Sequence, residues 1–242
     1  MNKIFFYFIV FLLSPPRILS QTIPRNISIF ILAGQSNMAG RGGVYNDTSK
    51  NIIVWDGVIP PECRSNPSIL RLTAKLEWEE AKEPLHADID VNKTNGVGPG
   101  MSFANRVVNR FGMVGLVPCS VGGTKLSQWQ KGEFLYEETV KRAKAAVASG
   151  GGSYQAVLWY QGARPYLDVV RKAQLETDLE NVNCVDAMGL PLEPDGLHLT
   201  TSSQVRLGKM MVDAFLAIRP IPSSAKLFSG LSVLVLFPLF LL

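Results

Sequence analysis

Three short apolar segments, each ending at a glycine-containing turn, constrain the fold of this chain more than any other feature. They cover residues 27–33, 113–120 and 156–160, and each is rich in β-branched or bulky apolar residues. Uninterrupted apolar runs of this length are typical of strands buried in a parallel sheet. Amphipathic helical patterns at residues 100–111 and 133–148 lie between them. This alternation predicts an α/β fold, a three-layer α/β/α sandwich with a parallel sheet and active residues at the carboxyl ends of its strands.

The remaining elements follow from weaker patterns. Residues 68–80 are the best helix candidate in a long polar stretch, and residues 168–179 resemble another helix. Residues 182–188 fit a last strand, and residues 202–217 fit a closing helix. We expect one folded domain over residues 27–218, because a chain of 242 residues is too short for two ordinary α/β domains.

The two ends of the chain read as processing segments. Residues 1–20 combine Lys3, an apolar stretch and a small residue near the end, which predicts a signal peptide and secretion. Residues 223–242 place small residues and a short spacer before an apolar tail, the layout of a GPI-attachment signal that would tether the protein to a membrane. An alternative origin for this tail is an altered reading frame or exon end.

Composition narrows the partners and the redox chemistry. The formal charge is +4 with scattered basic residues, so nucleic acid is not an expected partner. The odd count of cysteines, Cys63, Cys119 and Cys184, allows at most one internal disulfide, and their spacing fits no zinc site. Three acceptor sequons agree with secretion, at Asn26, Asn46 and Asn92.

Histidine is the scarcest catalytic resource of the chain, which contains only His86 and His198. His198 lies three residues after Asp195, across a turn that contains a glycine. A carboxylate at this spacing can accept the Nδ1 proton of the imidazole and stabilise its charged form. An ordinary polar turn with a helix cap is the alternative interpretation of such a lone pair, and His86 has no comparable partner.

Ser36 strengthens the catalytic interpretation, because it follows the first apolar segment within the sequence GQSNMAG at residues 34–40. A serine there faces the crevice above a parallel sheet, and its own N–H can point at a developing oxyanion. The position also suits a helix N-cap. Met38 stands where the second glycine of G-x-S-x-G would be, which disfavours an α/β-hydrolase elbow.

Four ordered blocks together resemble the carbohydrate esterases related to sialate O-acetylesterases, a branch of the SGNH hydrolases with a flavodoxin-like sheet. The blocks are GQSNMAG at 34–40, VPCSVGGT at 117–124, WYQG at 159–162 and DGLH at 195–198. Residues 92–103 are also similar to the Gly-Pro-Gly segment of that family.

The resemblance implies a serine esterase that removes O-acetyl groups from carbohydrates through an acyl-enzyme. Ser36, Asp195 and His198 would form its triad. The implied oxyanion donors are the N–H groups of Ser36 and of Gly122 or Gly123, with the Gln161 amide. The implied partner is an acetylated carbohydrate, and no metal or organic cofactor is expected.

The sequence departs from the family pattern after Gly162, where an acidic segment is replaced by residues 163–166, ARPY. The interval before Asp195 has room for one helix and one strand, not for two of each. We therefore expect an internal deletion, with one strand and one helix missing from the sandwich. An active esterase is one hypothesis. The alternative is a catalytically dead, secreted glycan-binding protein or a defective splice isoform.

Overall fold

The computed structural model describes residues 26–162 and 167–218 of the chain. The predicted signal peptide at residues 1–20 and the predicted tail signal at residues 223–242 lie outside the described residues. Among the helices that are described, none is long and apolar enough to cross a membrane.

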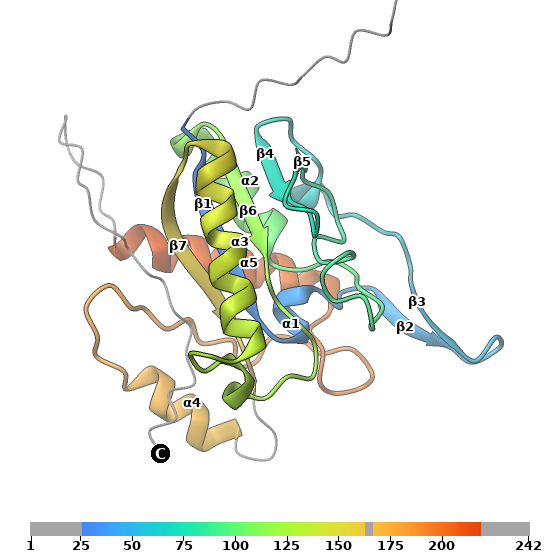
Figure 1. Cartoon of the computed structure of the whole chain (residues 1–242). Helices are drawn as coiled ribbons and strands as arrows, with labels where there is room; N and C mark the ends of the chain where they lie inside the picture. The colour runs from blue at the N-terminus through green and yellow to red at the C-terminus, as the bar shows by residue number, and fades with distance from the viewer. Residues whose placement is uncertain (1–25, 163–166, 219–242) are drawn as a thin grey trace, which may run out of the picture.

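A five-stranded sheet forms the centre of the molecule, with the strand order β5-β4-β6-β1-β7 (Figure 1). Strand β1 pairs in parallel with β6 on one side and β7 on the other, β4 continues in parallel beside β6, and β5 is antiparallel. The strands are β1 (Ser28–Gly34), β4 (Ile69–Leu72), β5 (Trp78–Glu80), β6 (Val114–Pro118) and β7 (Ser153–Tyr160). The three predicted buried segments are thus the three adjacent parallel strands β6, β1 and β7.

Strand β1 lies at the heart of the core, and all seven of its residues are buried. The Phe30 side chain meets three other aromatic rings, with centroid distances of 5.0 Å to Phe103, 5.8 Å to Phe111 and 5.4 Å to Phe215. All three contacts have the edge-to-face geometry that aromatic pairs prefer. This aromatic cluster joins the central strand to helices on one face of the sheet.

Helices cover both faces of the sheet and complete three layers (Figure 1). Helix α3 (Phe134–Gly150) crosses one face, while α2 (Gly100–Phe111) and α5 (Thr201–Ile218) pack together on the other. The approach of α2 and α5 is close, because a Cβ atom at Gly208 would clash with the Ser102 hydroxyl. This arrangement confirms the predicted α/β/α sandwich.

The helix predicted at residues 68–80 is wrong, because this segment forms β4 and β5 instead. Strand β4 pairs with β6, and a turn that includes Leu76 at φ +64° leads into the antiparallel β5. The edge of β6 offers hydrogen bonds that an isolated amphipathic helix in this segment could not use. Tertiary pairing therefore overrides the local helical pattern.

The strand predicted at residues 182–188 is also absent from the described structure. Between α4 (Leu167–Leu175) and α5 the chain forms neither a helix nor a strand of a sheet. Asp186 forms an ion pair with Arg171 of α4, and Asn183 donates a hydrogen bond to the Ala214 carbonyl of α5 at 3.4 Å. These side-chain contacts anchor the segment beside the sheet, and β7 remains the last strand at this edge.

Shorter elements complete the described structure. A two-stranded hairpin, β2 (Val44–Asp47) and β3 (Ile52–Trp55), projects from the body of the molecule (Figure 1). Single turns form α1 (Ser36–Ala39), η1 (Pro61–Cys63) and η2 (Leu126–Trp129). All three cysteines are free thiols.

Candidate active site

Ser36 occupies the carboxyl end of the central strand. Gly34 closes β1 with φ +119°, and a Cβ atom there would clash with the Tyr160 carbonyl oxygen at the end of β7. The Gln35 N–H donates to that same carbonyl at 2.9 Å, so β1 and β7 remain joined up to the turn. The chain then enters α1, whose first residue is Ser36. The serine is therefore held at a fixed point above the sheet.

His198 and Asp195 meet Ser36 at this point. The Nε2 atom of His198 lies 3.0 Å from the Ser36 Oγ, and its Nδ1 atom lies 2.6 Å from the Asp195 Oδ2. Both distances are those of hydrogen bonds. The three residues thus form a continuous Ser-His-Asp chain, although 162 positions separate Ser36 from His198 in the sequence.

The environment keeps Asp195 ionised. Partial burial acts to raise its pKa, but the N–H groups of His198 and Leu197 and the imidazole itself stabilise the carboxylate. Their combined effect is larger, so the pKa of Asp195 lies below its ordinary value. The Asp195 side chain is 48% exposed and the His198 side chain 22% exposed, so water and substrate can reach the pair.

Residues 191–200, called the triad loop below, carry this pair and are held together by their own backbone hydrogen bonds. The Glu193 N–H donates to the His198 carbonyl at 2.7 Å, and the Thr200 N–H donates to the Pro191 carbonyl at 3.2 Å. A single β-bridge joins Leu192 and Leu199. These contacts explain how a catalytic-type arrangement forms even though the preceding segment contains no strand.

Of the four expected oxyanion donors, only the glycine pair and Ser36 line the same pocket as the triad. A Cβ atom at Gly122 would lie 3.4 Å from the Ser36 Cβ, which places this glycine beside the nucleophile. The Gly122 N–H, however, donates to the Asp90 carboxylate at 3.2 Å. Gly123 follows with φ +79° and open space beside its Cα atom.

The Gln161 side chain is bound to a backbone carbonyl and does not line the pocket at Ser36. Its Nε2 atom donates to the Thr124 carbonyl at 3.2 Å, and the Gln35 amide donates to the same carbonyl at 2.5 Å. Gln161 lines a separate pocket between β7, α4 and the segment that precedes α5. Its expected part in binding an oxyanion stays a prediction.

A buried ion pair beside the nucleophile was not identified from the sequence. Arg41 pairs with Asp90 and donates to the Gly40 carbonyl and the Asn95 side chain, both at 2.8 Å. Both charged side chains are almost fully buried, and Asp90 also accepts the Gly122 N–H. The pair therefore supports the glycine turn next to Ser36. An arginine directly after the GQSNMAG block was the available signal.

His86 takes no part in the site. It is fully buried and does not line the pocket at Ser36. Burial lowers the pKa of His86 to about 3, so its imidazole is neutral at ordinary pH. His198 is the histidine that contacts Ser36.

The triad opens into a pocket of about 650 Å³ whose outer wall is the β2–β3 hairpin. Tyr45 and Ile53, both exposed, supply apolar surface there, and Asn46 and Thr94 supply polar groups. The asparagines of the sequons are exposed, and Asn46 lies in the wall of this pocket. Glycosylation of Asn26, Asn46 and Asn92 stays a prediction.

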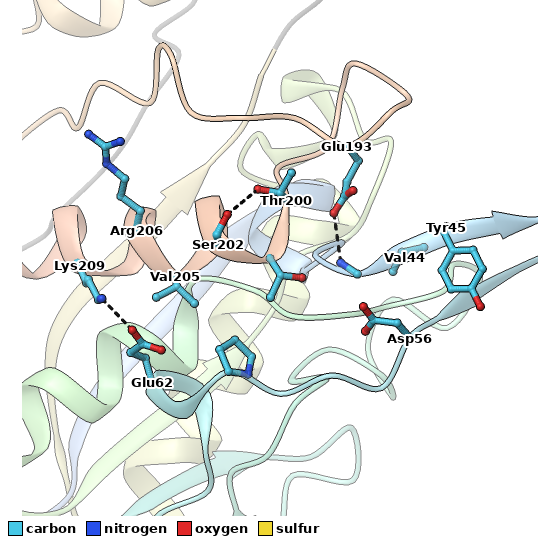
Figure 2. Close-up of a pocket in the computed structure, with 13 residues that line it drawn as sticks. Val44, Tyr45, Asp56, Glu62, Glu193, Thr200, Ser202, Val205, Arg206 and Lys209 are labelled. Carbon is cyan, nitrogen blue, oxygen red and sulfur yellow. Dashed lines mark hydrogen bonds and ion pairs between the residues drawn. The ribbon is translucent and has the colours of Figure 1, made fainter.

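A second open pocket of about 830 Å³ adjoins the first (Figure 2). Val44, Tyr45 and Glu193 line both pockets. The Glu193 carboxylate accepts the Gly43 N–H at 3.3 Å, which ties the triad loop to the base of the hairpin. Further along the same pocket, Lys209 pairs with Glu62 at 3.0 Å. The second pocket thus adds carboxylate, hydroxyl and cationic side chains to the open surface that begins at Ser36.

Comparison with known proteins assigns the chain to one family. The model of the family described as carbohydrate esterase, sialic acid-specific acetylesterase, matches residues 26–165 and 163–217. The two matched segments overlap at residues 163–165, directly after Gly162, where the sequence predicts an internal deletion.

Relatives agree with the family model. A probable carbohydrate esterase of Arabidopsis thaliana is 47% identical over an alignment of 241 positions, gaps included, that spans 81% of this chain and 92% of the relative. The solved structure of that Arabidopsis protein has a TM-score of 0.77, with 80% of this chain and 99% of that chain covered. A more distant likeness, to NanS, has 15% identity and a TM-score of 0.44 over 81% of this chain and 62% of NanS. The chain belongs to the sialic acid-specific acetylesterase family of carbohydrate esterases.

Proposed function

We propose that this protein is a serine esterase that removes O-acetyl groups from carbohydrates, with Ser36 as nucleophile. The observation that carries the proposal is the hydrogen-bonded chain from the Ser36 Oγ through His198 to Asp195. Family membership supports an acetylated carbohydrate as substrate. This series of hydrogen bonds also favours an active esterase over a protein that only binds glycans.

The first half of the reaction forms an acyl-enzyme. His198 Nε2 takes the proton of the Ser36 hydroxyl while the Oγ atom attacks the acetyl carbonyl carbon, and the carbonyl electron pair moves onto oxygen. That electron pair then re-forms the carbonyl, the carbon–oxygen bond to the sugar breaks, and His198 gives its proton to the departing sugar oxygen. Asp195, whose pKa is lowered, stays ionised and stabilises the imidazolium in between.

In the second half, water takes the place of the sugar. His198 removes a proton from the water as it attacks the acetyl-Ser36 carbonyl. It then protonates the Ser36 Oγ as the carbonyl re-forms and acetic acid leaves, which ionises to acetate in solution. Water is the only reactant that the cycle consumes besides the ester, and Ser36 and His198 end in their starting states.

The oxyanion formed in both halves needs hydrogen-bond donors beside Ser36. The N–H groups of Ser36 and Gly123 are the donors that this proposal favours. The Gly122 N–H can join them only by exchanging its hydrogen bond to Asp90. The Gln161 amide would likewise have to leave the Thr124 carbonyl.

We also propose that the protein is secreted. The expected signal peptide at residues 1–20 supports this route, and so does the exposure of the asparagine in each of the three sequons. Treatment of the protein from its native source with an N-glycosidase should lower its apparent mass. An unchanged mass would count against glycosylation at these sites.

The test of the esterase is hydrolysis of p-nitrophenyl acetate by the purified chain, compared with Ser36→Ala. We expect Ser36→Ala to lower kcat by about 10⁴-fold or more, because the nucleophile is lost. A fluorophosphonate probe should label the unmodified chain at Ser36 and leave the variant unlabelled. A folded chain, as judged by circular dichroism, that shows neither labelling nor Ser36-dependent hydrolysis would overturn the proposal.

A further inference from the structure

Asn37, the residue after Ser36, contacts the chain on both sides of His198. Its Oδ1 atom accepts the Leu199 N–H at 2.9 Å, and its Nδ2 atom donates to the Leu197 carbonyl at 3.4 Å. The Asn37 side chain is almost fully buried, so water does not compete strongly for these bonds. One amide thus links the turn that carries the nucleophile to the loop that carries the base.

Helix α5 adds a third contact to the same amide. Gln204, which is fully buried, donates from Nε2 to the Asn37 Oδ1 at 3.4 Å. The Asn37 oxygen therefore accepts from both the triad loop and the helix that follows it. This contact restrains the rotation of the Asn37 side chain.

The Asp195–His198 pair is fixed within its own loop without help from Asn37. The Asp195 Oδ1 accepts the N–H groups of Leu197 and His198 at 2.8 Å and 2.9 Å, while its Oδ2 holds the imidazole. Asn37 does not take part in these bonds. What Asn37 contributes is the placement of the whole loop against the end of β1.

We infer that Asn37 is a positioning residue that sets the distance between the His198 imidazole and the Ser36 hydroxyl. This inference rests on the proposed esterase function and names a residue beyond the triad and the oxyanion donors. A misplacement of about 1 Å between reacting groups can cost about a hundredfold in rate. Asn37 therefore acts on kcat through His198, without contact to the substrate.

The test compares Asn37→Ala with the unmodified chain by kcat, KM and the low-field proton resonance of the His198 Nδ1–H. We expect kcat to fall about 10- to 100-fold because the loop is no longer anchored. KM should stay within about twofold, since no substrate contact is removed. The low-field resonance should persist, because the Asp195–His198 hydrogen bond is made within the loop.

Asn105→Ala is the matched control. Asn105 also bridges two backbone groups, donating to the Glu62 and Arg64 carbonyls at 3.0 Å and 2.9 Å, but it lies in α2 away from the triad. Its removal should lower thermal stability by a comparable or smaller amount, because Asn105 is only half-buried, and should leave kcat unchanged. Equal losses of kcat in the two variants would show a general effect on folding and overturn the inference.

Gln204→Leu carries the test if Asn37→Ala does not fold. This variant removes the contact that restrains the Asn37 side chain and keeps both bonds of Asn37 to the loop, so kcat should fall by less than is expected for Asn37→Ala, with KM and the low-field resonance unchanged. Full kcat in Gln204→Leu would then overturn the inference. Full kcat in a folded Asn37→Ala, or loss of its low-field resonance, makes the inference wrong while the esterase stands. An unmodified chain without Ser36-dependent hydrolysis overturns both.

Discussion

The nucleophile and the base of the proposed reaction are held in place by very different parts of the structure. Ser36 follows β1, a wholly buried strand with neighbours on both sides. Asp195 and His198 lie in a segment that has no named helix or strand between α4 and α5. Several large apolar side chains are exposed along this segment, namely Leu179, Met188, Leu192 and Leu197. The sheet therefore positions the nucleophile, whereas a small number of hydrogen bonds positions the base.

Asp195→Asn should show the largest effect, and it tests the base side of this comparison. The amide oxygen can still accept the loop N–H groups, but the amide donates to His198 and favours the tautomer that cannot take the Ser36 proton. We expect kcat to fall by about 10⁴-fold. Thermal unfolding, measured alongside, should be almost unchanged because the side chain is half exposed. A large loss of stability would show that Asp195 supports the fold more than the chemistry.

Phe30→Ala tests the nucleophile side. Phe30 is fully buried at the centre of the aromatic cluster, so its truncation should lower the free energy of unfolding by about 3–5 kcal/mol. Phe134→Ala is the matched control, since the Phe134 side chain is 76% exposed and its loss should cost less than about 0.5 kcal/mol. Denaturant unfolding measures both. Similar losses for the two variants would contradict the central role assigned to β1.

Asp186→Asn should have the smallest effect on stability, and it tests the irregular segment between α4 and α5. The hydrogen bond from Arg171 holds the pKa of Asp186 below its ordinary value, 3.8. A lowered pKa adds stability above pH 3.8, and this stability is lost as the pH falls through the folded-state pKa. At pH 7 the variant should unfold no more than about 2 °C below the unmodified chain, because the pair is exposed.

The difference between the two chains should disappear as the pH falls below the folded-state pKa of Asp186, where the carboxyl is protonated in both states. A pH-independent difference would mean that Asp186 acts by packing rather than by charge. A much larger difference at pH 7 would show that the irregular segment depends on this ion pair.

The parts of the molecule that the sequence predicted correctly are those in which local pattern and tertiary environment agree. The segments that became β1 and β6 are buried at every position, and the apolar residues 156–160 of β7 are buried or half-buried, so these patterns have one interpretation. Helices α2 and α5 likewise lie close to their predicted ranges. Ser36 meets His198 as expected, because the end of β1 fixes the serine and hydrogen bonds within residues 191–200 hold the turn that carries Asp195 and His198.

The wrong predictions have a common physical cause. Residues 68–80 could form an amphipathic helix, and only the open edge of β6 decides for strands. Residues 182–188 could form a strand, but Asp186 and Asn183 take side-chain partners instead. The Arg41–Asp90 pair joins positions 49 residues apart, and no local pattern reports such a contact.

The β2–β3 hairpin should tolerate substitutions that the end of β1 cannot. Its exposed residues Tyr45 and Ile53 face the pocket, yet the hairpin does not pair with the five-stranded sheet. By contrast, any side chain at Gly34 would collide with the neighbouring strand. Selection for a new substrate can therefore act on the hairpin while the nucleophile keeps its place. A mutant library built for altered specificity should begin there.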